Sequence, residues 1–255
     1  MKVSALQKNR KGGFTLIELM VVIAILAALA SIGYGPIIDH MNDGDRQKAS
    51  SNLKSVYTIL QQFKTDHGSF PCDTTGEMLR EEKPELTFGE VTGSYSNDYF
   101  RQLFFDTQKN KSEKPFFAKI SVAGKMIQNE GDDKRANGMT LQRGENAMAY
   151  VMRKNPDDPN QKLGVIETNA PLAICGLYPT TTPYAGSAVA FDMSSFRGHA
   201  FLLTVDGAVK DLEKNLEKAD GNREKGRLKA DKSIFPESDE GADTSDEYLV
   251  LSPEL

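Results

Sequence analysis

One apolar segment near the N-terminus dominates the hydrophobic pattern of the chain. It runs from Phe14 to Ile38, and its only strongly polar side chains are Thr15, Glu18 and Ser31. A helix rises about 1.5 Å per residue, so about 25 helical residues span roughly 37 Å, which is enough to cross the apolar core of a bilayer. We therefore expect a transmembrane helix over residues 14–38.

The helical pattern continues beyond this segment with a different surface. Apolar residues recur at intervals of four and three, which marks one face of an amphipathic helix. They are Ala49, Leu53, Val56, Leu60 and Phe63. Gly68 and Pro71 are helix stop signals. We predict one helix from Phe14 to Asp66, with an amphipathic half over residues 39–66 that covers a sheet or loops.

Three residues near the middle of this predicted helix favour a local distortion. Gly33, Gly35 and Pro36 lie toward the outer end of the apolar half. Proline lacks a backbone donor and strains the preceding turn. We therefore expect a kink or a melting point there.

The remaining residues, 67–255, show the shorter patterns of a globular body. We expect helices over Met78–Glu82, Asn97–Phe105 and 211–230, strands over Phe116–Val122, Asn146–Arg153, Leu172–Leu177 and Tyr248–Leu251, and a loop over 129–146. The sharpest local signal is Asp206-Gly207 between two apolar runs, which predicts a hairpin with a type I′ turn. The expected fold is α+β, with a long N-terminal transmembrane-amphipathic helix packed on a small antiparallel sheet.

The charge of the chain is unevenly distributed. Residues 1–13 carry four of the 31 basic residues and none of the 36 acidic ones, so the remainder has a formal charge of −9. A basic flank stays in the cytoplasm by the positive-inside rule, which places the C-terminal body on the other side. An acidic body argues against nucleic-acid binding, which needs a basic face.

The N-terminal segment has three possible interpretations. It is a plain signal anchor, a prepilin leader followed by an anchor, or a secretory signal cut after Ala30, because Ala28-Leu29-Ala30 has the small-x-small form. Glu18 bears on the choice, since a carboxylate in an apolar segment costs about 3 kcal/mol on insertion scales. Glu18 either has a partner or lies near the headgroups and snorkels to them.

The sequence Gly-Gly-Phe-Thr-Leu-Ile-Glu at residues 12–18 resembles the processing site of type IV prepilins and type II secretion pseudopilins. In that family a membrane peptidase cuts after the glycine and methylates the new N-terminus. The resemblance implies a leader over residues 1–13, cleavage between Gly13 and Phe14, and N-methylation of Phe14. It also implies that Glu18 pairs with the Phe14 amine of a neighbouring subunit during filament assembly.

The segment Asp66–Pro71 is similar to the turn that ends the first helix in major pseudopilins. Beyond Thr75 the resemblance is only architectural. The resemblance implies a non-enzymatic structural subunit of a type IV pilus or a type II secretion pseudopilus, assembled as a homo- or hetero-filament of pilin-like subunits. Its other implied partners are prepilin peptidase and the inner membrane. The sequence leaves open which of the two systems is involved and whether the subunit is major or minor.

Few residues in the body suggest chemistry. Cys72 and Cys175 form an even pair in a compartment that we expect to be oxidising, so we predict a disulfide, with two free thiols as the alternative. An acidic run could bind calcium, as in some major pseudopilins, although a solvated charge run is the simpler interpretation. It comprises Asp239, Glu240, Asp243, Asp246 and Glu247.

The other side chains give no catalytic pattern. His40, His67 and His199 lack metal-ligand spacing, and the chain contains no glycine-rich phosphate loop and no serine-histidine-aspartate arrangement. We therefore expect no enzyme and no resident cofactor. Two rival hypotheses stay open: a secreted or periplasmic binding protein released after Ala30, and a membrane-anchored enzyme with an unrecognised site.

Overall fold

A computed structural model describes residues 14–82, 84, 91–105, 112–119, 121–122, 125–126, 140–219, 221–237 and 242–254. The side chains of residues 30–40, 121–122 and 125–126 are not described. The chain divides into two compact units, Met1–Asn42 and Asp43–Leu255. The first unit contains the N-terminal part of the long helix, and the second contains its remainder and the globular body.

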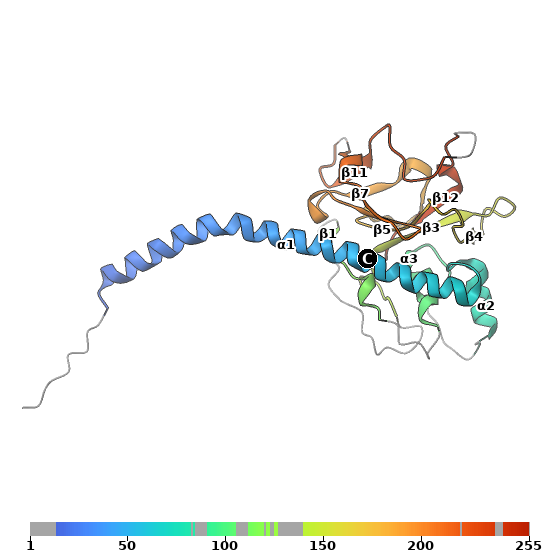
Figure 1. The fold of residues 1–255 in the computed structure, drawn as a ribbon, viewed down its shortest axis with the longest axis horizontal. Coiled ribbons are helices and arrows are strands. Elements are labelled where there is room, and N and C mark those ends of the chain that lie inside the picture. The colour runs from blue at the N-terminus through green and yellow to red at the C-terminus, as the bar shows by residue number, and fades with distance from the viewer. Residues whose placement is uncertain are drawn as a thin grey trace, which may run out of the picture. The chain divides into compact units, whose positions relative to one another are not determined.

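Helix α1, Leu16–His67, is a single α-helix of 52 residues (Figure 1). Its bounds agree with the predicted Phe14–Asp66 to within two residues. The helix ends at Gly68, which has a φ of 80° and whose N–H donates to the Lys64 carbonyl at 2.8 Å, the left-handed cap that glycine allows. The five stripe residues from Ala49 to Phe63 are each at most 1% exposed, so the predicted core-facing stripe is confirmed.

The body is built on an antiparallel sheet of seven strands. Its order is β6-β12-β3-β5-β8-β9, with β4 paired to β3. The bounds are β3 Met148–Lys154, β4 Lys162–Leu163, β5 Pro171–Cys175, β6 Tyr184–Ala185, β8 Phe201–Thr204, β9 Val209–Asp211 and β12 Tyr248–Leu251. The predicted strands over 146–153, 172–177 and 248–251 are confirmed, and the last of them lies inside the sheet.

A second, three-stranded sheet has the order β10-β11-β7, and a short pair joins β1 to β2. The bounds are β1 Ser121–Val122, β2 Lys125–Met126, β7 Ala190–Asp192, β10 Leu216–Lys218 and β11 Lys225–Leu228. The predicted surface helix over 211–230 is therefore wrong. Gly221, with a φ of 79°, lies between β10 and β11, and each strand buries one residue, Leu216 or Gly226, while its charged neighbours stay at least partly exposed.

Short helices complete the body. They are α2 Asp73–Glu82, α3 Ser96–Phe100, η1 Arg101–Phe104, η2 Lys114–Phe116, η3 Gly186–Ala188, η4 Ser195–Arg197, η5 Glu213–Asn215 and η6 Ser245–Glu247. The first begins five residues before the predicted Met78, and α3 with η1 matches the predicted helix over 97–105. Within the predicted strand over 116–122, Phe116 ends η2 and Ser121–Val122 form β1. Of the predicted loop over 129–146, residues up to 139 lie outside the described residues.

Aromatic side chains fill the space between these helices and the sheet. The Phe100 ring centroid lies 4.9 Å from those of both Phe116 and Tyr150, and Phe104 contacts Phe116 edge-on at 5.7 Å. Burying each such side chain stabilises the fold by about 1.5–3 kcal/mol. Phe100 and Phe104 therefore belong to the hydrophobic core.

The hairpin at Asp206-Gly207 is confirmed, but its turn type is different. A type I′ turn requires a positive φ at both central residues, and here only Gly207 has one, at 86°. The turn packs against α1: the Tyr57 hydroxyl and the Gln61 amide donate to the Val205 carbonyl at 3.2 and 3.4 Å. A Cβ at Gly207 would lie 2.7 Å from the Tyr57 ring.

We predict that Gly207→Ala lowers the free energy of unfolding by about 2–4 kcal/mol, because a left-handed alanine costs about 1–2 kcal/mol and the contact with Tyr57 adds overpacking. Gly221→Ala is the matched control, since Gly221 has a φ of 79° and a Cβ added there would have no atom within 4 Å. It should cost about 1 kcal/mol. Chemical unfolding of the full chain in detergent measures both, and equal losses would contradict the role given to the Tyr57 contact.

Candidate functional site

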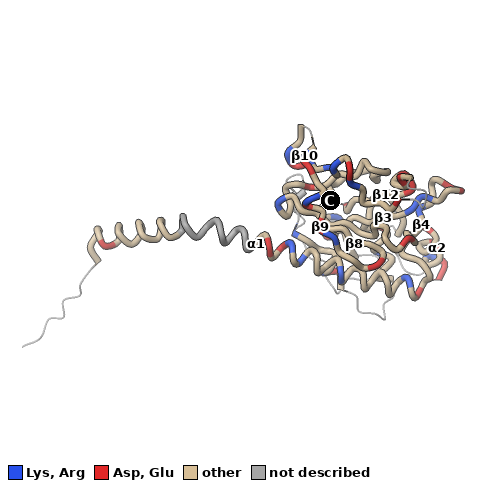
Figure 2. Tube along the Cα trace, turned by 45° about the horizontal axis from the view of Figure 1, so that its top comes forward, with Lys and Arg blue, Asp and Glu red and all other residues tan. Residues whose placement is uncertain are grey.

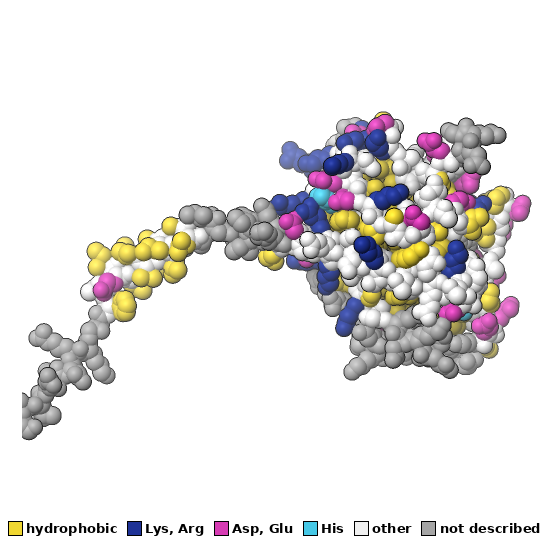
Figure 3. Space-filling view, in the orientation of Figure 1, with side chains coloured by type: hydrophobic (Ala, Val, Ile, Leu, Met, Phe, Trp, Pro, Cys, Tyr) yellow, Lys and Arg dark blue, Asp and Glu magenta, His cyan; other side chains and the backbone are white. Residues whose placement is uncertain are grey.

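The N-terminal unit presents an apolar surface to its surroundings. Phe14, Leu16 and Ile17 are 86%, 77% and 70% exposed, and every large apolar side chain through Leu29 is exposed (Figure 3). The only charged residue in positions 14–29 is Glu18. A helix that is apolar on all sides needs an apolar environment, which this unit does not supply from within itself.

Among the described residues, no helix meets the length and hydropathy expected of a membrane span.

Thr15 and Glu18 form a capping box at the start of α1. The Thr15 amide and hydroxyl both donate to Glu18 Oε2 at 2.8 Å, and the Glu18 amide donates to Thr15 Oγ1 at 3.3 Å. These bonds satisfy donors that a helix N-terminus leaves open, and the carboxylate lies at the positive end of the helix dipole. Sequence reasoning assigned Glu18 to assembly but missed this local role, although threonine followed three residues later by glutamate is its signature.

The structure describes only some of the other residues predicted to act in processing and assembly. Gly13 lies outside the described residues. Phe14 immediately precedes the capping box and is the most exposed large apolar residue among those whose side chains are described. Gly33, Gly35 and Pro36 lie within α1, and the kink expected there stays a prediction.

Cys72 and Cys175 are both buried and are free thiols in the structure, and the disulfide between them stays a prediction. The Cys72 sulfur lies beside two hydroxyls, 3.6 Å from Thr75 Oγ1 and 3.9 Å from Ser69 Oγ, in the turn before α2. Cys175 ends β5 and is fully buried, and burial raises the pKa of its thiol to about 12. A thiol in that state stays protonated and unreactive.

The acidic run near the C-terminus shows no metal site where it is described. Asp243 pairs with Glu237 in an isolated β-bridge, and the Lys154 ammonium donates to the Asp246 carbonyl at 2.6 Å. Asp239 and Glu240 lie outside the described residues. Within the described part of the chain, no group of three histidine, cysteine or acidic residues could hold a metal ion.

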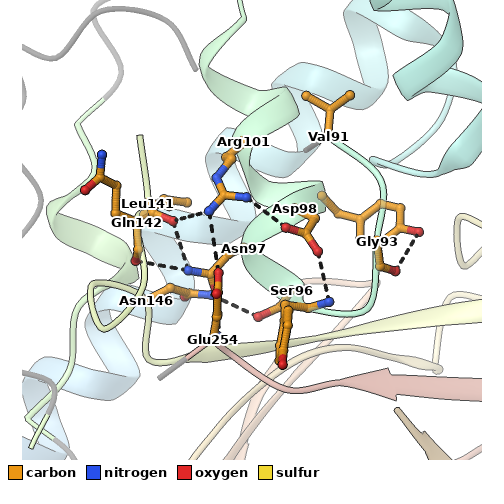
Figure 4. Close-up of polar contacts among 12 residues, drawn as sticks. Val91, Gly93, Ser96, Asn97, Asp98, Arg101, Leu141, Gln142, Asn146 and Glu254 are labelled. Atoms are coloured by element: carbon orange, nitrogen blue, oxygen red, sulfur yellow. Dashed lines mark hydrogen bonds and ion pairs between the residues drawn. The ribbon is translucent and has the colours of Figure 1, made fainter. Parts of the chain in front are cut away.

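A buried polar network lies where α3, the segment 140–147 and the C-terminal residues meet (Figure 4). Asn97 makes four hydrogen bonds at its centre. Its side-chain Nδ2 donates to the backbone carbonyls of Leu141 and Gln142 at 2.9 and 3.2 Å. Its Oδ1 accepts from Asn146 Nδ2 at 3.0 Å and from the backbone amide of Glu254 at 2.9 Å. Asn97 and Asn146 are both 0% exposed.

An ion pair extends the same network toward its edge. Arg101 Nη1 donates to Asp98 Oδ1 at 2.8 Å, while its Nη2 donates to the Leu141 carbonyl at 3.2 Å and lies 3.8 Å from Glu254 Oε2. The Ser96 amide donates to the Ser252 carbonyl at 2.9 Å. Most partners in this network are backbone atoms, so the network holds the last residues of the chain in place rather than presenting groups to a substrate.

Positively and negatively charged residues are interspersed along the chain of the body (Figure 2). Several pair locally, as in Arg227 with Glu217 at 2.9 Å and Arg153 with Glu167 at 3.2 Å. An exposed pair such as Arg227 with Glu217 contributes at most about 1 kcal/mol.

The prokaryotic N-terminal methylation motif matches residues 8–34. The type II secretion system core protein G of Aeromonas hydrophila is 37% identical over 79 residues, which are 31% of this chain and 55% of that protein. The core protein G of Pectobacterium carotovorum is 39% identical over 94 residues, which are 37% of this chain and 60% of that protein. The core protein G of Escherichia coli K12 is 30% identical over 103 residues, which are 40% of this chain and 70% of that protein. No solved structure matches the chain.

The methylation motif, the long first helix and the antiparallel body define a pilin-like protein. Within that class, the chain belongs to the family of type II secretion system core protein G, the pseudopilins. It spans between 55% and 62% of the length of the first three relatives that it matches.

We predict that Asn97→Ala lowers the free energy of unfolding by about 2–4 kcal/mol, because it removes four hydrogen bonds of one buried side chain at once. Amide hydrogen exchange at Glu254 should also accelerate, since its N–H loses its acceptor. Asn160→Ala is the control, because Asn160 is exposed. This variant should change the free energy of unfolding by at most about 0.5 kcal/mol. A change at Asn97 as small as at Asn160 would show that the network is dispensable.

Proposed function

We propose that this protein is a structural subunit of a type II secretion pseudopilus. Prepilin peptidase removes the leader of residues 1–13, residues 14–38 hold the subunit in the inner membrane, and the body of residues 67–255 lies outside the cytoplasm. The exposed apolar surface of residues 14–29, interrupted only by Thr15 and Glu18, is the observation that carries the proposal. Lipid before assembly, and neighbouring subunits after it, supply the apolar surroundings that this surface requires.

The name of the relatives supports this role, because each is a core protein of the type II secretion system. The name also agrees with a structural subunit rather than an enzyme. The methylation motif supports processing at Gly13-Phe14 with methylation of Phe14. On this proposal the outer half of α1, residues 39–66, belongs to the body, and residues 33–36 are the place where the helix bends or melts during assembly.

The capping box gives Glu18 a defined position before assembly. Cleavage leaves a cationic amine on Phe14, one residue before the cap. In the filament, we propose, the Glu18 carboxylate pairs with the Phe14 amine of a neighbouring subunit. Two charges that are each costly in an apolar environment then neutralise each other and fix the stagger between subunits.

The first test is the N-terminus of the native protein. We expect the mature chain to begin at Phe14 and to carry one methyl group on its amine, as read by intact mass and N-terminal sequencing of protein from membranes. Replacing Gly13 with a bulky residue should leave uncut precursor in the membrane. A chain that begins at Ser31 would instead identify a secretory signal cut after Ala30.

The second test separates assembly from insertion. Glu18→Ala should be cut and inserted normally, because the cleavage site precedes it and loss of a carboxylate makes insertion easier by about 2–3 kcal/mol. Its filament yield should collapse, since breaking a buried ion pair on one side costs about 3–5 kcal/mol at every subunit. The measurement compares shear-released filaments with the membrane-bound pool. Glu77→Ala, at an exposed position on α2, is the control, and normal filaments from Glu18→Ala would show that Glu18 only snorkels.

A further inference from the structure

His199 lies in the body among charged side chains that come from several elements. It follows the turn at η4, where Phe196, Arg197 and Gly198 have φ values of 48°, 58° and 83°. The ring is buried, and the face of Phe201 stacks on it at a centroid distance of 6.5 Å. This left-handed turn places the imidazole next to the first turns of α1 within the body.

The two ring nitrogens face side chains from three elements. On one side, Nδ1 lies 2.8 Å from Asp211 Oδ2 on β9. On the other, Nε2 lies 2.5 Å from Arg46 Nη1 on α1. Arg46 is itself paired with Asp43, one turn earlier on the same helix. Glu213 Oε1, in η5, lies 3.4 Å from the same Nε2.

These contacts define the protonation state of the ring. A guanidinium has donors only, so Nε2 must be the acceptor of the Arg46 bond and cannot carry a proton. Nδ1 therefore carries the proton and donates to the Asp211 carboxylate. The observed arrangement requires neutral His199 in the Nδ1–H tautomer, and in that state the ring connects α1 to β9.

Adding a proton changes which elements the ring connects. The new N–H at Nε2 faces the donor of Arg46, so that bond is lost and two cations meet. Glu213 is the acceptor already within reach of the same nitrogen, while Nδ1–H keeps Asp211. The charged groups facing the ring are Asp43 and Arg46 from α1, Asp211 from β9 and Glu213 from η5, so a protonated ring is held by β9 and η5 alone.

We propose that His199 is a pH-operated latch between the start of the body portion of α1 and the edge of the main sheet. The neutral ring holds Arg46, and the protonated ring releases it and turns to Glu213. Residues 43–48 precede the buried stripe, which begins at Ala49. Their other contacts with the body include two weak ones at its surface: Asp45 pairs with Lys119 at 3.5 Å, and the Lys48 ammonium lies 5.5 Å from the centre of the Phe117 ring. Release therefore loosens residues 43–48 while the stripe stays packed.

The test is hydrogen exchange of the full chain in lipid nanodiscs at about pH 7.5 and about pH 5, which bracket the range in which histidines change charge. Protection factors, corrected for the intrinsic pH dependence of exchange, are compared for residues 43–48. We expect them to fall about 10-fold at the lower pH in the native sequence. Amides of β3 and β5 should keep their protection, because these central strands do not supply a partner to the ring.

Two variants make the test specific. His199→Gln keeps a donor and an acceptor but no titration, so residues 43–48 should stay protected at both pH values. His67→Gln removes a histidine that lies on α1 itself, where its ring packs on Phe63 at 4.4 Å, and this variant should behave as the native sequence does. Equal pH dependence in native and His199→Gln protein would overturn the proposal.

A second measurement decides the matter if His199→Gln loses the protection of its core strands. Long-range nitrogen–proton NMR of the native protein identifies the tautomer of His199 at about pH 7.5. We expect Nδ1–H, with Nε2 unprotonated. An Nε2–H tautomer is incompatible with the Arg46 bond and would overturn the proposal. Neither measurement depends on filament assembly, so the latch and the proposed function can fail separately.

Discussion

Helix α1 must satisfy two different surroundings with one continuous backbone, and the rest of the structure follows from that constraint. In the body, the stripe from Ala49 to Phe63 is buried, so its five side chains join the core beneath the sheet. In the N-terminal unit, the side chains from Phe14 to Leu29 are exposed and apolar. The helix can therefore be stable in water only where the body covers it, and the other part needs apolar surroundings from elsewhere.

The sequence predicted the features that depend on neighbours along the chain. Periodicity predicted α1 and its stripe, and short apolar runs bounded by turn signals predicted β3, β5 and β12, because these patterns are local. The helix predicted over 211–230 failed for a physical reason. Its charged side chains fit an exposed helix face equally well, but the segment forms β10 and β11, and β11 pairs with β7, Lys225 opposite Asp192, in the second sheet. That pairing joins distant residues, and no local pattern contains it.

The polar network around Asn97 was equally inaccessible from the sequence. Its partners Leu141, Asn146 and Glu254 are separated from it by 44, 49 and 157 positions. A buried asparagine looks the same in a sequence as an exposed one. The two cysteines are a different case. Their even number predicts a bond and both thiols are buried, but their distance in the fold rather than their number decides whether a disulfide forms.

The position of the last strand connects these observations to assembly. Strand β12 lies between β6 and β3, and the network then fixes Ser252 and Glu254, so the main sheet is complete only when the C-terminal residues are in place. Such long-range closure is slow relative to local structure, because its loop entropy must be overcome before the contacts form. The capping box and the apolar segment need only residues near Thr15 and Glu18. On the proposed function, membrane insertion and cleavage are therefore independent of body folding. Filament growth requires a processed apolar segment and a folded body. The outer half of α1 is the element that connects these two parts.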